Sequence, residues 1–298
     1  MDLSGVYPAL TTPFAADGSV SLIDLKYNIE RYNSTGLAGY VVIGSTGESV
    51  LLSRGETESI LATVKEAAGQ GKRLIAGTGA ESTAETIERT KRAAELGYHF
   101  ALVKTPYYYK PVYKSEVYLR HYRSVADASP IPVLLYSVPI FTGITLETPE
   151  ILALAEHPNI IGIKDSSGAI QRVVEVAGQA PKSFRVLTGG AAVVYPALAA
   201  GAQGAILALA AVLPERCLAV YDAWKAGRHA EALAGQQQLA LASQTIASEN
   251  GIAGLKYAMD LRGYWGGLPR LPLLPVGEGK KQLIRNLISD MEPAAASA

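Results

Sequence analysis

Short apolar runs alternate with amphipathic segments along most of the chain. The apolar runs are rich in β-branched side chains and predict buried strands. They span residues 6–11, 39–43, 73–76, 98–103, 131–136, 160–164, 184–187 and 204–209. The segments between them repeat with helical periodicity, and two begin with the capping-box pattern, at Ser53/Glu56 and Ser82/Glu85. The helices predicted in the first part of the chain are 21–35, 53–69, 82–97, 115–128, 148–156, 169–179 and 191–200.

Eight strand–helix units within about 210 residues, joined by short turns, predict a (β/α)8 TIM barrel over residues 1–213. Residues 214–298 predict a C-terminal helical extension, with helices at 214–226, 229–247, 251–261 and 280–291 and a frayed end at 292–298. An open doubly wound sheet is the alternative. It fits the number of units less well, and no break in composition divides the chain into halves.

One segment without charge is long enough to span a bilayer, from Val193 to Leu213. Pro196, Gly201, Gln203 and Gly204 interrupt it, and Gly201 has the character of a helix C-cap. We therefore expect a helix of small residues leading into a buried strand at 204–209.

The composition narrows the class of function. The 298 residues carry 27 Lys+Arg and 27 Asp+Glu, so neither nucleic acid nor a membrane surface is an expected partner. Cys217 is the single cysteine, which excludes an intrachain disulfide and fits a reducing compartment. Residues 1–5 lack the basic and apolar regions of a signal peptide, so we expect a cytoplasmic protein.

Lys164 closes the uncharged run 160–163. A run without alternation is expected to be buried on both faces, as in a parallel sheet. Desolvation at its end would lower the pKa of the lysine and leave free amine near neutral pH. Such an amine attacks ketones and forms a Schiff base. The alternative is a lysine that ends a strand and extends its ammonium into solvent.

The strand ends of a TIM barrel carry its chemistry. One amine, several hydroxyls and many glycines are predicted there, in segments 11–12, 44–48, 77–79, 105–108, 136–137, 164–166, 188–190 and 206–209. The four histidines fall in or beside predicted helices and show no metal-ligand spacing. Gly77-Thr78-Gly79 lacks the third glycine of a dinucleotide fingerprint and predicts a tight turn. We therefore expect no metal and no cofactor.

Tyrosines occupy two of these positions. Tyr136 ends the strand before that of Lys164, where it can pack in the core or move protons. Beside a desolvated amine and the Ser45-Thr46 hydroxyls, a proton relay is the favoured interpretation. Residues 107–109 are three consecutive tyrosines that cannot all point one way, and some are expected at a subunit contact.

Four segments together resemble the Schiff-base pyruvate aldolases, a family that includes dihydrodipicolinate synthase and N-acetylneuraminate lyase. They are Gly44-x-Thr46-Gly47-Glu48, Thr105-Pro106-Tyr107-Tyr108, Tyr136-x-Val138-Pro139-x-x-Thr142-Gly143 and Gly162-Ile163-Lys164-Asp165. Their order and spacing match the family, and the likeness runs from about Gly5 to Met291.

The resemblance implies roles for individual catalytic residues. Lys164 matches the lysine that condenses with the ketone of pyruvate, and Tyr136 matches the tyrosine that relays protons. Thr46 matches a threonine hydrogen-bonded to that tyrosine, and Ser45 its neighbour at the pyruvate carboxylate. Tyr108 matches a tyrosine that reaches across a tight dimer into the partner's site.

The resemblance also implies a substrate pocket and an assembly. Gly189 and Ile206 match residues that line the pyruvate pocket. The family is usually a homotetramer, built as a dimer of dimers, and works without a cofactor on pyruvate and an aldehyde.

Within the family, the chain looks most like mitochondrial 4-hydroxy-2-oxoglutarate aldolase. Ser166 matches that enzyme's serine just after the lysine, whereas Thr46 departs from its asparagine. Phe141 stands where dihydrodipicolinate synthase has a carboxylate-binding arginine. Thr57 and Glu81 replace the His and Asn of the bacterial feedback site for lysine. Further likeness lies in segments 76–83, 121–122, 129–139 and 157–160.

The prediction is a class I aldolase that cleaves 4-hydroxy-2-oxoglutarate to pyruvate and glyoxylate through a Schiff base on Lys164. The main alternative is dihydrodipicolinate synthase, acting on pyruvate and aspartate semialdehyde, and a sugar-acid aldolase comes third. A non-catalytic keto-acid binding module on the same barrel is the alternative from another class. The set of Lys164, Tyr136 and Thr46 argues against it, because a sensor needs no nucleophilic amine.

Overall fold

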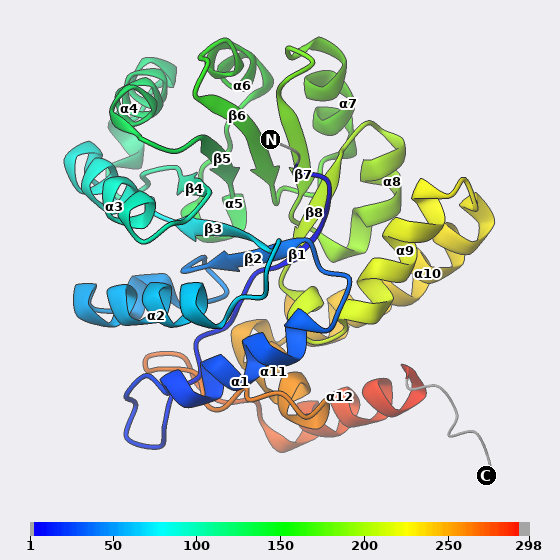
Figure 1. Cartoon of the computed structure of the whole chain (residues 1–298). Helices are drawn as coiled ribbons and strands as arrows, with labels where there is room; N and C mark the ends of the chain where they lie inside the picture. Colours follow the sequence, from blue (N-terminus) through cyan, green and yellow to red (C-terminus); the bar gives the residue numbers. More distant parts are fainter. Residues whose placement is uncertain (1–2, 292–298) are drawn as a thin grey trace.

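The computed structural model describes residues 3–291 and is a barrel of strands surrounded by helices (Figure 1). The predicted frayed end at 292–298 lies outside the described residues, as do the first two residues of the N-terminal segment.

Eight parallel strands form one sheet in the order β1-β8-β7-β6-β5-β4-β3-β2. They are β1 (Gly5–Pro8), β2 (Gly39–Val42), β3 (Arg73–Gly77), β4 (Phe100–Lys104), β5 (Val133–Ser137), β6 (Ile160–Asp165), β7 (Arg185–Thr188) and β8 (Gly204–Leu207). The barrel closes between β1 and β2, where Ala9 bridges Val41 and the Leu10 amide donates to the Val41 carbonyl at 2.9 Å. The structure confirms the predicted (β/α)8 barrel.

Helices follow the strands around the outside of the barrel (Figure 1). They are α1 (Leu22–Asn33), α2 (Arg54–Ala67), α3 (Thr83–Glu95), α4 (Ser115–Ala128), α6 (Thr148–Ala155), α7 (Ile170–Gln179) and α8 (Val194–Ala199). The short helix α5 (Pro139–Thr142) lies inside this ring, at the end of β5. The Ser53/Glu56 capping box at α2 is complete, with each side chain bonded to the other residue's amide. At α3, Ser82 accepts from the Glu85 amide.

Side chains alternate between the inside and the outside of the barrel, as the strand period requires. One buried cluster fills the interior and includes Tyr7, Val41, Leu102, Leu134, Tyr136, Leu187 and Ile206. Two larger clusters lie between the strands and the helices. The strands are therefore buried on both faces, which explains their unbroken apolar character.

The C-terminal extension consists of α9 (Pro214–Lys225), α10 (His229–Ala242), α11 (Gly251–Leu261) and α12 (Glu278–Met291). It shares a hydrophobic cluster with the barrel, in which Ile246 and Ile284 belong with Val6. After α11, the chain packs against α1, where Tyr264 stacks on Tyr32 at 4.7 Å between ring centroids. The extension is thus continuous with the barrel core.

Two predicted helices are broken. The segment 191–200 begins as a 3₁₀ turn, Ala191–Val193, and becomes α8, whose first turn holds Pro196. The segment 229–247 changes after Ala242 into a π-helix, Ser243–Ser248. Such π turns occur often at functional sites, and this one faces a cavity described below. The short helix α5 was not predicted.

The charge-free segment 193–213 forms α8, β8 and a 3₁₀ turn, Leu209–Ala211, as a helix leading into a buried strand. No helix within residues 3–291 is long and apolar enough to cross a membrane.

Candidate active site

Lys164 lies at the C-terminal end of β6 with its side chain inside the barrel. The residue is 4% exposed. Its ammonium nitrogen lies 4.3 Å from the ring centroid of Tyr136. Within residues 3–291, no carboxylate is in ion-pair distance of this nitrogen, and the adjacent Asp165 is paired with Arg172 at 3.5 Å instead. A buried amine without a counter-ion is an available nucleophile.

The strand register brings three polar side chains to one level. Lys104 on β4 is paired with Tyr136 on β5, and Tyr136 is paired with Lys164 on β6. Residues in register on neighbouring parallel strands point to the same face. The tyrosine therefore stands between two lysines at the mouth of the barrel.

The hydroxyl closest to Tyr136 comes from the turn after β2. Ser45 Oγ lies 3.5 Å from the Tyr136 hydroxyl. The expected bond from Thr46 to Tyr136 is not present among the described residues, and Thr46 instead lines the cavity above Lys164. The turn presents adjacent side chains in different directions, so Ser45 rather than Thr46 lies beside the Tyr136 hydroxyl.

The turn after β2 has a constrained backbone. Ile43, a β-branched residue, has φ 60°, and Glu48 has φ 56°. Such values are costly for β-branched side chains and persist only where the surroundings impose them. At Ile43 the chain changes direction and carries Ser45 over Tyr136.

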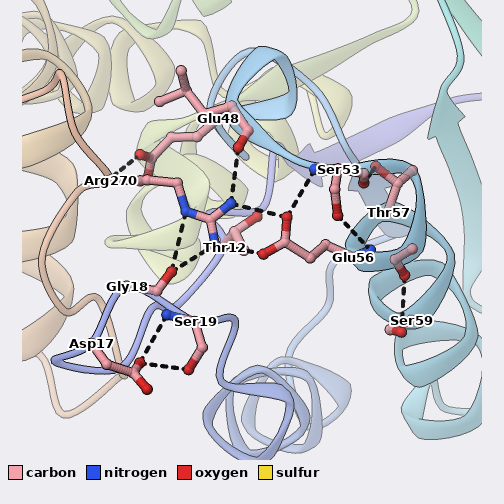
Figure 2. Close-up of polar contacts among 12 residues, drawn as sticks. Thr12, Asp17, Gly18, Ser19, Glu48, Ser53, Glu56, Thr57, Ser59 and Arg270 are labelled. Atoms are coloured by element: carbon pink, nitrogen blue, oxygen red, sulfur yellow. Dashed lines mark hydrogen bonds and ion pairs between the residues drawn. The ribbon is translucent and has the colours of Figure 1, made fainter.

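Arg270, between α11 and α12, ties this turn to the C-terminal extension (Figure 2). Its guanidinium donates to Glu56 at 2.6 Å and to the carbonyl of Gly18 at 2.6 Å. Its amide donates to Glu48 Oε2 at 2.8 Å. The bond from Arg270 lowers the pKa of Glu56 to about 2.

Glu48 also forms a buried ion pair. Its Oε1 lies 2.6 Å from the ammonium nitrogen of Lys256 on α11, and both side chains are 0% exposed. Lys256 also donates to the carbonyl of Leu268 at 2.9 Å. Burial lowers the pKa of Lys256, against the raising effect of Glu48. Residues of the C-terminal extension thus hold the turn that carries Ser45 and Thr46 in place.

A cavity of about 200 Å³ opens above Lys164 and Tyr136. Barrel residues line one side, and the π-helix and α11 line the other. The wall comprises Thr46, Tyr136, Val138, Ile140, Phe141, Lys164, Ser166, Gly189, Gly190, Ala191, Ala208, Leu209, Ser243, Ala247, Ser248, Gly251, Ile252 and Leu255. No local pattern in the sequence predicted that residues 243–255 would form part of the site.

Ser166 and Gly189 both lie in this wall, as predicted for substrate contacts. A Cβ atom at Gly189 would meet Ser166 Oγ at 1.9 Å, so only glycine fits beside that serine. Ile206 is completely buried in the interior cluster with Tyr136 and does not line the cavity; Ala208 and Leu209 occupy that part of the wall.

Tyr108 is outside the cavity of its own chain. It is 73% exposed and packs edge-on against Tyr109, with 5.0 Å between ring centroids. Its predicted role in a partner's site remains a prediction.

The site has the groups needed for an amine to add to a carbonyl carbon and form a Schiff base. It offers one nucleophile, two hydroxyls that can pass a proton, and a small enclosed volume. Within residues 3–291, no three His, Cys, Asp or Glu side chains are grouped so as to hold a metal ion.

Solved structures share this fold over almost the full chain. A dihydrodipicolinate synthase from Bacillus anthracis has a TM-score of 0.94 and 27% identity, covering 98% of this chain and 100% of the other. The chloride-inhibited dihydrodipicolinate synthase from Acinetobacter baumannii, complexed with pyruvate, has a TM-score of 0.92 and 32% identity, covering 97% and 99%.

Sequence comparison gives the same result. A 4-hydroxy-tetrahydrodipicolinate synthase from an Exiguobacterium species is 38% identical over 273 residues, which are 92% of each chain. The model of the dihydrodipicolinate synthetase family matches residues 2–291. The chain therefore belongs to the dihydrodipicolinate synthetase family and is a lyase of the class I, Schiff-base-forming pyruvate aldolase type.

Proposed function

We propose that the protein condenses pyruvate with an aldehyde through a Schiff base on Lys164. The observation that carries this proposal is the buried Lys164 amine, which has no carboxylate partner within residues 3–291 and lies 4.3 Å from the Tyr136 ring at the floor of a cavity.

The reaction begins when the Lys164 amine adds to C2 of pyruvate. Loss of water gives an iminium, and loss of a proton from C3 gives an enamine. The enamine carbon attacks the aldehyde carbon, and the aldehyde oxygen takes up a proton. Addition of water to the resulting imine releases the product and returns the free lysine.

Tyr136 and Ser45 are the proton carriers in this scheme. Their hydroxyl oxygens lie 3.5 Å apart, at the outer limit of a hydrogen bond, and the Tyr136 ring centroid lies 4.3 Å from the amine. Hydrogen bonds that pass a proton during catalysis are often long without substrate and shorten when it binds. Thr46, on the cavity wall, takes the role of contacting the pyruvate carboxylate. This assignment reverses the expected roles of Ser45 and Thr46.

The aldehyde is proposed to be aspartate semialdehyde. The sequence motifs favoured cleavage of 4-hydroxy-2-oxoglutarate, but the relatives described above are named dihydrodipicolinate or 4-hydroxy-tetrahydrodipicolinate synthases. Their names support the alternative better. The product would then be 4-hydroxy-tetrahydrodipicolinate: the amine of the condensed semialdehyde, in place of water, adds to the imine carbon, closes the ring and displaces the Lys164 amine.

One observation keeps 4-hydroxy-2-oxoglutarate as the second candidate. Phe141, 60% exposed, lines the cavity where the resemblance implies an arginine in dihydrodipicolinate synthase. A phenyl ring cannot bind a carboxylate in bidentate fashion.

The assembly is proposed to be the family's homotetramer. The exposed Tyr108 and Tyr109 pair supports a subunit contact at this loop, because aromatic residues are enriched in interfaces.

Borohydride trapping with pyruvate, followed by peptide mass spectrometry, tests the proposal. We expect a stable adduct on Lys164. Steady-state turnover with aspartate semialdehyde and with 4-hydroxy-2-oxoglutarate then identifies the substrate. A folded protein that forms no adduct at neutral pH would refute the Schiff-base mechanism.

A further inference from the structure

We propose that Lys104 is a specificity-determining residue that binds an anionic group, a carboxylate, on the aldehyde substrate. This inference rests on the proposed condensation and defines the class of its second substrate. It also accounts for the absence of an arginine at Phe141, because the anion would be held on the other side of Tyr136.

Lys104 faces the same space as the catalytic groups. It lines two hollows that adjoin the Lys164 cavity. One, of about 320 Å³, shares Val138, Phe141 and Ile252 with the cavity, and the other shares Tyr136. Neighbouring strands are about 4.8 Å apart, so the Cα atoms of Lys104 and Lys164 are about 10 Å apart, across Tyr136. A short substrate can span that gap.

Lys104 is also the positively charged side chain in the walls of these hollows that can bind a substrate. Among the described residues, the three hollows are lined by only three charged side chains, Glu48, Lys104 and Lys164. Glu48 is committed to Lys256 at 2.6 Å, and Lys164 is the nucleophile. Lys104 is therefore the remaining group that can neutralise a substrate carboxylate.

The ammonium of Lys104 has donors to spare. It donates to the carbonyl of Gly79 at 3.0 Å and forms a long ion pair with Glu81, 4.0 Å from Oε1, without a hydrogen bond to it. Glu81 accepts instead from the amides of Tyr107 and Tyr108, both at 2.9 Å. An ammonium has three donors, so two remain for a ligand.

The local structure makes room for this side chain. A Cβ atom at Gly79 would lie 2.6 Å from the Lys104 amide nitrogen and 2.9 Å from its Cγ. Glycine at position 79 thus allows the lysine to lie along the turn after β3. The side chain is 15% exposed, and burial lowers the pKa of Lys104. A carboxylate bound in the hollow would offset the free-energy cost of burying the charged ammonium.

The arrangement gives a definite substrate pose. The enamine stands at Lys164, the aldehyde carboxylate lies at Lys104, and the aldehyde oxygen faces the hydroxyls of Tyr136 and Ser45 between them. An anchor at each end holds the reacting carbons together.

The experiment compares Lys104→Met, which keeps the length and removes the charge, with the wild type and with Lys182→Met. Lys182 is an exposed lysine before β7, at the opposite end of the barrel, and its variant matches the change in net charge. Each protein is assayed with pyruvate and an aldehyde that carries a carboxylate, either aspartate semialdehyde or glyoxylate, and with glycolaldehyde, which carries none.

We expect Lys104→Met to lower kcat/KM for the anionic aldehydes by about 30-fold or more, and for glycolaldehyde by less than about threefold. Borohydride trapping with pyruvate alone should be unchanged, and Lys182→Met should resemble the wild type. Lys104→Arg should retain most of the preference for the anionic aldehydes.

Equal losses for charged and neutral aldehydes, or no loss for either, would overturn the role of Lys104 while leaving the Schiff-base mechanism intact. Failure of the wild type itself to trap pyruvate would instead refute the proposed function.

Discussion

Lys256 and Lys164 are both buried lysines. Lys256 pairs with the turn after β2 and Lys164 lies under the neighbouring cavity, yet their surroundings differ completely. Lys256 is 0% exposed and has a dedicated carboxylate, Glu48, at 2.6 Å and a backbone acceptor at 2.9 Å. Lys164 is 4% exposed, lies 4.3 Å from the Tyr136 ring and opens to a cavity, and none of the described carboxylates is within ion-pair distance of it.

The comparison separates two uses of a buried ammonium. A fully paired lysine connects segments that are distant in sequence, and removing it leaves an uncompensated charge. A lysine with no counter-ion is costly to bury but is free to react. Lys256 therefore holds the site together, and Lys164 acts within it.

The largest expected effect is on catalysis at Lys164. Lys164→Met should lower kcat/KM for the condensation by about four orders of magnitude, because the covalent step is lost. Stability should change by less than about 1 kcal/mol, since no ion pair is broken. Steady-state kinetics and urea unfolding measure the two effects, and a variant with near wild-type turnover would break the distinction.

The opposite pattern is expected at Lys256. Lys256→Met should destabilise the protein by about 3–5 kcal/mol, because Glu48 is left buried without its partner. Urea denaturation followed by circular dichroism measures the loss. The double variant Lys256→Met/Glu48→Gln is the control and should recover part of it; no recovery would mean that the ion pair is not the cause.

Tyr136 links the reactive lysine to its proton supply. Tyr136→Phe keeps the ring beside Lys164 and removes the hydroxyl, so kcat should fall by about 10²- to 10³-fold. Borohydride trapping with pyruvate should still label Lys164. If kcat stays within a factor of three of the wild type, another group moves the proton.

The Arg270–Glu56 pair helps to hold the turn after β2 against the C-terminal extension. Its contribution to the free energy of unfolding should fall in acid. The folded pKa of Glu56 is about 2, below its usual 4.5, so its contribution is present above pH 4.5 and is lost as the pH falls towards 2. Allowing for partial exposure, the loss should be about 1–2 kcal/mol. Glu56→Gln should remove that part of the pH dependence of unfolding in urea titrations from pH 5 to 2.5, and unchanged acid dependence would contradict it.

The smallest effects distinguish the two neighbouring hydroxyls. Ser45→Ala should lower kcat about five- to tenfold, because its hydroxyl faces Tyr136. Thr46→Val should raise the KM for pyruvate with little change in kcat. The reverse result would restore the roles that the resemblance implied.

Much of the fold followed from local pattern. The Ser53/Glu56 box marked the start of α2, and the uncharged run before Lys164 marked β6, because capping and burial act over a few residues. The breaks at Ala191–Val193 and Ser243–Ser248 were not predicted, because long-range packing rather than local helix propensity decides the backbone conformation there.

The site was predicted only in part. Lys164, Tyr136, Ser166 and Gly189 do lie together on one cavity wall. Ile206 belongs to the buried interior cluster, as Tyr136 does, but is not among the residues that line the cavity.

The sequence by itself determined the barrel, the proposed nucleophile and the strand ends at which the candidate site lies, because these depend on period and on composition within short segments. Only the tertiary structure decided which hydroxyl lies beside Tyr136 and that Lys256 rather than Lys164 forms an ion pair with a carboxylate. It also decided that Lys104 lines hollows that adjoin the Lys164 cavity. Those facts depend on turn geometry, strand register and the return of the C-terminal extension over the barrel, and none of these is encoded within a single segment of the chain.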